Sequence, residues 1–112
     1  MAQRNVSCGL VLSLCCGLSV AAQEAAVGPQ PAALDGAQSR VYKSFDGGEL
    51  RLHVFTPPAP TPVGSQPAIV FFFGGGWTSG SVAQLAPQSK HLAQRGMTAI
   101  VADYRVFGRH KT

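Results

Sequence analysis

Residues 68–77 read Ala-Ile-Val-Phe-Phe-Phe-Gly-Gly-Gly-Trp, and this stretch decides the fold. An unbroken apolar run rich in Ile, Val and Phe is typical of a strand that is buried on both faces, as in a parallel sheet. Three consecutive glycines end that strand, because they lose the most entropy on ordering and have no side chain to pack. Their N–H groups can approach a ligand closely, so the stretch predicts a buried strand that leads into an oxyanion- or anion-binding loop.

A helix and a second strand follow the glycines. Pro87 is suited to the first turn of a helix, and Gly96 is suited to the end of one. One apolar-to-small face repeats with helical spacing over this stretch, at Leu85, Ser89, Leu92 and Ala93. Residues 97–102 form a second apolar run that Asp103 closes. Strand, helix and strand in this order predict a right-handed βαβ crossover with two parallel strands.

A hairpin precedes the crossover. Residues 41–45 and 50–56 alternate between apolar and polar side chains, and Asp46-Gly47-Gly48 between them is suited to a tight turn. Residues 57–67 hold five prolines and predict a stiff surface connection, because proline is excluded from helix interiors and central strands. The expected fold class is therefore α/β, with an antiparallel hairpin followed by the crossover.

The glycine stretch carries a family resemblance. Phe73-Gly74-Gly75-Gly76-Trp77 resembles the His-Gly-Gly-Gly oxyanion-hole motif that follows the third strand in α/β-hydrolase esterases and lipases. The resemblance continues through Gly80-Ser81 and the helix end at 92–96. Asp103-Tyr104-Arg105 is similar to the Asp-Tyr-Arg that ends the next strand in feruloyl-esterase-like and hormone-sensitive-lipase-like members. The resemblance covers residues 39–112. It implies the N-terminal portion of an α/β-hydrolase domain, because the chain is shorter than a complete hydrolase domain.

The resemblance implies roles for five residues. The backbone N–H groups of Gly75 and Gly76 would hold the oxyanion, with Gly74 as support of the loop. Phe73 stands where the motif has His; it would brace the loop by packing, or it marks a member with weakened activity. Trp77 would line the acyl or alcohol pocket, or it packs to fix the loop.

We expect no catalytic residue in this chain. The nearest match to the Gly-x-Ser-x-Gly nucleophile elbow lies at 17–21, inside the N-terminal apolar segment. Candidate nucleophiles and bases elsewhere lack that context; they are Ser79, Ser81, Ser89, His53, His91 and His110. The histidines are interpreted as surface or packing residues, and Asp103 with Tyr104 as groups that tie down the end of a strand. No metal-ligand spacing is present, so no metal or cofactor is expected.

Residues 1–22 predict a secretory signal peptide. Arg4 precedes an apolar segment at 6–18, and small residues at 19–22 favour cleavage after Ala21 or Ala22. The apolar segment is shorter than the roughly 20 residues that span a bilayer, and a lipoprotein signal lacks the small residue before Cys15 or Cys16. We therefore expect a secreted or periplasmic protein with no stable membrane anchor. Residues 23–38 are rich in Ala, Pro and Gly and predict a flexible linker.

Other partners and other folds agree less well with this sequence. The net charge is +4 and the basic residues are scattered, so no nucleic-acid partner is expected. A dinucleotide-binding βαβ unit needs a third glycine at Ser79, although Asp103 imitates its ribose-binding acid. An exported anion-binding fragment without catalysis is a further alternative. The preferred interpretation is the N-terminal fragment of an exported carboxylic-ester hydrolase whose complete form acts on a small ester.

Overall fold

The computed structural model describes residues 27–58 and 66–111. The predicted signal peptide and most of the proline-rich connection lie outside these residues. In chain order the elements are β1 (Gln38–Phe45), β2 (Gly48–Phe55), β3 (Ala68–Phe72), the 3₁₀ turn η1 (Val82–Leu85), α1 (Ala86–Gln94), β4 (Thr98–Ala102) and α2 (Phe107–His110). The helices in this part of the chain are all too short or too polar to cross a membrane.

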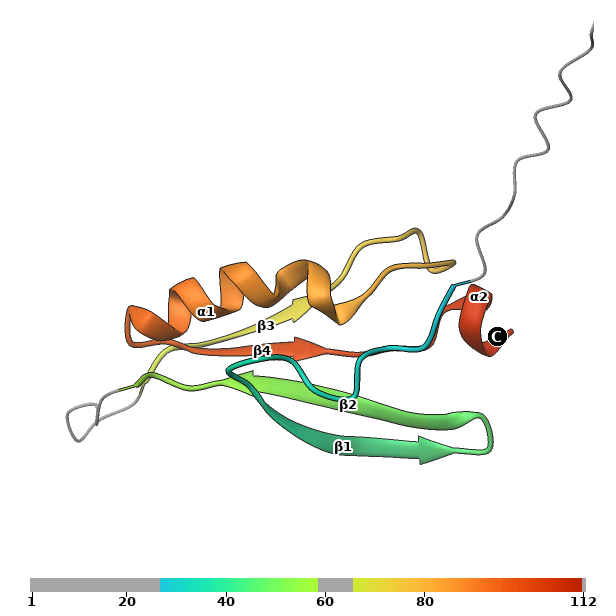
Figure 1. Cartoon of the computed structure of the whole chain (residues 1–112), viewed down its shortest axis with the longest axis horizontal. Coiled ribbons are helices and arrows are strands. Elements are labelled where there is room, and N and C mark those ends of the chain that lie inside the picture. Colours follow the sequence, from blue (N-terminus) through green and yellow to red (C-terminus); the bar gives the residue numbers. More distant parts are fainter. Residues whose placement is uncertain (1–26, 59–65, 112) are drawn as a thin grey trace, which may run out of the picture.

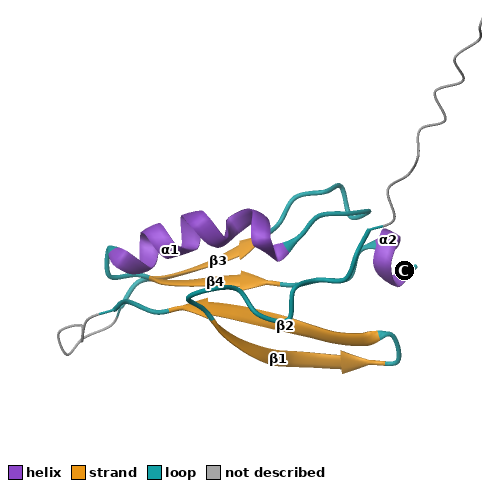
Figure 2. Ribbon diagram, viewed as in Figure 1, coloured by secondary structure: helices purple, strands orange, loops and turns teal. Residues whose placement is uncertain are grey.

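The strands form one sheet in the order β1-β2-β4-β3 (Figure 1). β1 and β2 pair antiparallel through the turn at Asp46-Gly47, and β2 continues antiparallel to β4. β3 pairs parallel to β4, with Ala68 opposite Thr98 and Phe72 opposite Ala102. The predicted α/β class is confirmed, because a hairpin is followed by two parallel strands with a helix between them (Figure 2).

Helix α1 begins and ends where the sequence predicts. Pro87 lies in its first turn, where the missing N–H costs nothing. At its C-terminus Gly96 has a φ of +91° and donates to the Ala93 carbonyl, while Met97 N–H donates to the Leu92 carbonyl. Ser89 and Ala93 are buried, so the predicted face of the helix is the one that packs on the sheet.

The core lies between α1 and one face of the sheet. It consists of Leu34, Phe55, Phe73, Val82, Ala93, Ala99, Val101 and Val106. Ile69 and Phe71 of β3 pack against it, because alternate residues of a strand share a face. On the opposite face Val70 is 50% exposed and Phe72 is 66% exposed. The expectation that β3 is buried on both faces is therefore wrong among the described residues, since α1 covers one face alone.

Residues 27–37 are not the flexible linker that composition predicts. Leu34 is buried in the core, and Gln30 accepts a hydrogen bond from Val82 N–H through its Oε1 (3.1 Å). Asp35 forms an ion pair with Lys90 of α1 (2.6 Å). This segment lies along the sheet because it has long-range partners, which local composition does not reveal.

The described C-terminal residues form a helical turn that packs on the glycine loop. Phe107–His110 is the single turn α2, closed by Lys111 in the left-handed conformation. Phe107 and Gly108 donate their N–H groups to the carbonyls of Trp77 and Thr78. A helical turn forms here because partners distant in the chain satisfy its first N–H groups.

Candidate active-site loop

The three glycines turn the chain sharply at the carboxyl end of β3. Gly75, Gly76 and Trp77 all have positive φ, of 147°, 60° and 65°. The Gly75 carbonyl accepts from Thr78 N–H and Ser79 N–H, both at 3.1 Å. A Cβ on Gly75 would lie 2.2 Å from the Ser79 carbonyl oxygen, so only glycine fits this turn.

The N–H groups of Gly75 and Gly76 are available to a ligand. Among residues 27–58 and 66–111 neither donates a hydrogen bond to a backbone or side-chain acceptor, in contrast to Thr78 and Ser79 just after them. A Cβ on Gly76 would meet no atom within 4 Å. Two adjacent N–H donors that have no acceptor among the described residues suit a negatively charged or developing oxygen.

An apolar hollow lies beside these donors. It encloses about 500 Å³ and is lined by Phe72, Phe73, Gly74, Gly75, Gly76, Trp77 and Tyr104. All five residues that the resemblance implies therefore lie together in one hollow. Tyr104 joins them from the end of β4. Its position follows from β4 pairing with β3, which brings the carboxyl ends of the two strands together.

Phe73 and Trp77 lie differently in this hollow. Phe73 is 3% exposed and stacks on Tyr104, with ring centroids 4.2 Å apart and planes 16° apart. The Tyr104 hydroxyl donates to the Phe73 carbonyl. Trp77 is 75% exposed and presents its ring at an angle to Tyr104, with centroids 5.5 Å apart. Phe73 is thus a packed part of the loop base, while Trp77 has most of its surface open to an incoming molecule.

The three candidate serines have structural positions away from the hollow. Ser79 Oγ donates to the Gly75 carbonyl (3.4 Å), and Ser81 Oγ accepts from Ala83 N–H at the start of η1 (3.2 Å). Ser89 is fully buried in α1. None of the three lines the hollow.

The histidines also lie outside the hollow. His53 is 1% exposed and bonds through Nδ1 to Ser39 Oγ (2.8 Å), and burial lowers its pKa. His91 is exposed, and His110 Nδ1 accepts from Val106 N–H (3.0 Å). In the described part of the chain no three metal-ligating side chains gather into a cluster.

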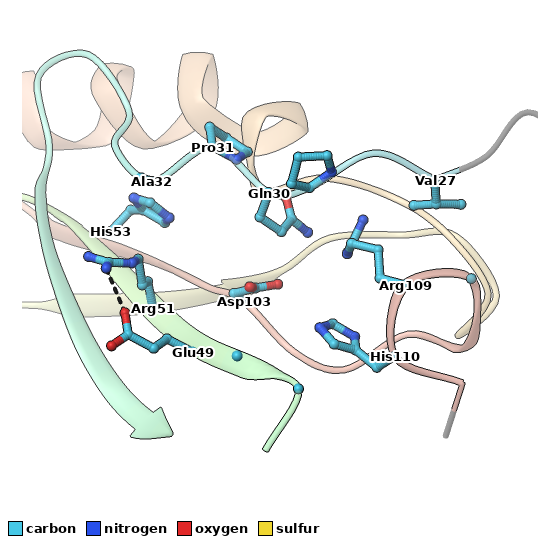
Figure 3. A pocket seen from close by; sticks show the side chains of 14 residues that line it. Val27, Gln30, Pro31, Ala32, Glu49, Arg51, His53, Asp103, Arg109 and His110 are labelled. Carbon is cyan, nitrogen blue, oxygen red and sulfur yellow. Dashed lines mark hydrogen bonds and ion pairs between the residues drawn. The ribbon is translucent and has the colours of Figure 1, made fainter. Parts of the chain in front are cut away.

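A second, polar cavity of about 440 Å³ lies between residues 27–32, the start of β2 and α2 (Figure 3). Asp103 lines this cavity and not the glycine hollow. Burial raises the pKa of its carboxyl group, against the opposing effect of Tyr104 N–H, which donates to Oδ1 (2.8 Å). Asp103 N–H donates to the Arg51 carbonyl, so this residue does tie down the end of β4. The cavity also contains Arg109 and Gln30, which sequence patterns did not single out because neither belongs to a motif.

Comparison with known structures identifies similar proteins. The matches include the thermophilic esterase Est2 of the planctomycete Thermogutta terrifontis in its native form, with propionate bound, and phosphorylated by paraoxon. Each is 50% identical, with a TM-score of 0.64 over 70% of this chain. The chain spans 28%, 29% and 30% of these three structures.

No protein-family model and no curated protein matches the chain. The sheet order, the glycine turn after β3 and the 50% identity to Est2 nevertheless agree. Together they relate this chain to the esterases of the α/β-hydrolase fold.

Proposed function

We propose that residues 73–77 form the oxyanion hole of an exported carboxylic-ester hydrolase. The observation that carries the proposal is the pair of N–H groups on Gly75 and Gly76, which have no acceptor among the described residues and border the apolar hollow. In ester hydrolysis a nucleophile adds to the carbonyl carbon, and the carbonyl oxygen becomes an oxyanion. Two N–H donors about 2.7–3.1 Å from that oxygen lower the barrier to its formation.

The hollow also suits a small ester. Phe72, Trp77 and Tyr104 offer aromatic surface against which a short acyl or alcohol group would pack. Est2 of Thermogutta terrifontis has been solved with propionate and with butyrate bound, both short-chain carboxylates. We propose esters of short-chain acids as the substrate class of the complete hydrolase that carries these residues.

The nucleophile, base and acid would come from residues outside the described ranges. The glycine loop stabilises charge that another group creates, so it does not hydrolyse an ester alone. The 112-residue chain is accordingly expected to show no triad-dependent ester hydrolysis, and no metal or cofactor is required for the acyl-transfer chemistry.

The test uses the complete hydrolase. Gly76→Val fills the open space beside the donor, and losing one oxyanion donor typically lowers kcat by about 10²–10³-fold. Gly96→Val is the matched control, because Gly96 also has a positive φ (+91°), a Cβ there also meets no atom within 4 Å, and Gly96 lies at the end of α1 and not in the loop. A normal kcat in a folded Gly76→Val enzyme would remove the oxyanion role from this residue.

Export is the second part of the proposal. The positive, apolar and small-residue segments of 1–22 support it, and cleavage there leaves the packed segment from Val27 intact. N-terminal sequencing of secreted or periplasmic protein is expected to begin at Ala22 or Gln23. Recovery of an intact Met1 in the cytosol would contradict export.

A further inference from the structure

Three successive residues of α2 donate hydrogen bonds to residues 77–80, the part of the loop that follows the three glycines. Phe107 N–H donates to the Trp77 carbonyl (2.8 Å), and Gly108 N–H donates to the Thr78 carbonyl (2.9 Å). Arg109 extends the series with its side chain, because Nη1 donates to the Gly80 carbonyl (2.8 Å). Gly108 must be glycine here, because a Cβ would lie 2.5 Å from the Thr78 carbonyl oxygen, while Arg109 is the residue of the three that bonds to the loop through its side chain.

Gly80 lies directly against the base of the loop. Its φ is +107°, and a Cβ there would lie 2.1 Å from the Gly74 carbonyl oxygen and 2.6 Å from the Phe73 ring. A shift of Gly80 would therefore displace Gly74, and with it the peptide that carries the Gly75 N–H. Arg109 is thus one hydrogen bond and one close contact away from the proposed oxyanion donors.

The burial of Arg109 indicates that its position is specific. Its Nε and Nη2 atoms are buried and have no hydrogen-bond partner among the described residues. Its guanidinium carbon lies 5.7 Å from the centroid of the Phe73 ring. In Figure 3 the side chain reaches from α2 toward Gln30, in the cavity that Asp103 also lines. In the described residues no carboxylate lies within ion-pair distance of it.

Arg109 is partly buried, and its guanidinium is held by one carbonyl bond, one ring face and the longer-range charge of Asp103, whose pKa burial raises and Arg109 acts to lower. Removing a cation from water costs free energy that such contacts offset only in a well-defined geometry. General stability would be served as well by an apolar side chain of similar length. The arrangement is explained if the guanidinium fixes Gly80 in place relative to Phe73, which the cation contacts as well.

We propose that Arg109 is a positioning residue that sets the geometry of the Gly75 and Gly76 donors through Gly80. The proposal rests on the oxyanion role proposed above. It predicts a loss in kcat with little change in KM, because a displaced donor weakens stabilisation of the transition state more than binding of the neutral ester. A misplacement of about 1 Å costs up to about 100-fold in rate, so we expect a loss of about 10- to 100-fold.

The experiment compares three variants of the complete hydrolase. Arg109→Met removes the cation and the donor, Arg109→Lys keeps a charged donor, and Arg40→Met is the control at an exposed site on β1. Active sites are counted with paraoxon, the reagent that phosphorylates the Thermogutta terrifontis enzyme, so that kcat refers to folded protein. Arg109→Met is expected to lower kcat at nearly constant KM, Arg109→Lys to restore part of it, and Arg40→Met to match the wild type.

Amide hydrogen exchange gives a second readout. In Arg109→Met we expect faster exchange at residues 75–80 and unchanged exchange in β2 and β4. A kcat equal to that of Arg40→Met would overturn the proposal, as would equal loss of protection throughout the sheet in both Arg109 variants. If Gly76→Val also retains full kcat, the oxyanion role itself fails; if Gly76→Val is impaired while Arg109→Met is normal, the positioning role alone fails.

Discussion

The ring of Tyr104 lies flat against the ring of Phe73, and its hydroxyl donates to the backbone carbonyl of the same residue. One side chain at the end of β4 thus contacts both the side chain and the main chain of the residue that precedes the glycines. The hydroxyl bond holds the main chain of residue 73 whichever side chain occupies that position, whereas the ring contact depends on Phe73.

The first prediction removes half of this contact. Tyr104→Phe keeps the stacked ring and deletes the hydroxyl, which leaves the Phe73 carbonyl without that donor. We expect the free energy of unfolding to fall by about 1 kcal/mol, the usual net value of one hydrogen bond. Chemical denaturation of the complete hydrolase measures it, with Tyr42→Phe as a comparison, since Tyr42 hydroxyl donates to the Asp103 carbonyl at the opposite side of β4 (2.7 Å). A loss no larger than the experimental error would show that water replaces the hydroxyl.

The second prediction separates the two central glycines. Gly75→Ala places a Cβ 2.2 Å from the Ser79 carbonyl and forces the turn to open, whereas Gly76→Ala places it in open space at a φ of 60°. We expect Gly76→Ala to cost about 1–2 kcal/mol, the strain of an L-residue in the left-handed region, and Gly75→Ala to cost clearly more. Thermal unfolding of both variants measures which of the two substitutions costs more stability. An equal loss in the two would mean that the turn relaxes without cost.

The hairpin and the crossover could be predicted because their signals are local. Alternation over residues 41–45 and 50–56, two apolar runs, and Pro87 with Gly96 at the helix ends were enough to predict the four strands and α1. The antiparallel pairing of β2 with β4, which joins the hairpin to the crossover, has no such local signal. The glycine run likewise indicated where five residues of the hollow would meet.

The remaining features depend on long-range partners. Leu34 enters the core from a segment whose composition resembles a linker, and α2 forms because Trp77 and Thr78 accept its N–H groups. Arg109 belongs to no motif, and only its bond to Gly80 marks it. The exposure of Val70 and Phe72 was missed for another reason: an apolar run does not show whether both faces of a strand are covered.

The third prediction concerns His53. Burial lowers its pKa, with the charge of Arg51 acting in the same direction and that of Asp103 opposing it. Between this lowered pKa and the unfolded value of about 6.5, the unfolded chain binds more protons than the folded chain. The free energy of unfolding should therefore rise with pH across this window, level off above about pH 6.5, and fall as the solution is acidified.

The comparison that isolates His53 is the variant His53→Gln, which does not titrate. The difference in unfolding free energy between wild type and variant should grow with pH up to about 6.5 and then stay constant. Chemical denaturation at several pH values measures it, and NMR titration of the ring gives the folded pKa directly. A ring that titrates at or above 6.5 would contradict the prediction.

The fourth prediction concerns the 112-residue chain by itself. Among the described residues β3 pairs with β4 along one edge only, and Val70 and Phe72 project from its uncovered face. An apolar strand with unpaired N–H and C=O groups templates association with another chain. We expect the chain to self-associate and to unfold without a sharp transition, as measured by sedimentation and by thermal unfolding. A soluble wild-type monomer with a sharp transition would contradict this.

Lysine substitutions on β3 distinguish association through this strand from general instability. Val70→Lys and Phe72→Lys place charge on the exposed face, where lysine blocks edge-to-edge pairing at little cost to the core. Both substitutions should raise the highest concentration at which the chain remains monomeric. Phe71→Lys is the matched control, because Phe71 packs toward α1 and a buried charge there should unfold the chain. If Val70→Lys and Phe72→Lys associate as strongly as the wild type, the surface that drives association lies elsewhere than on β3.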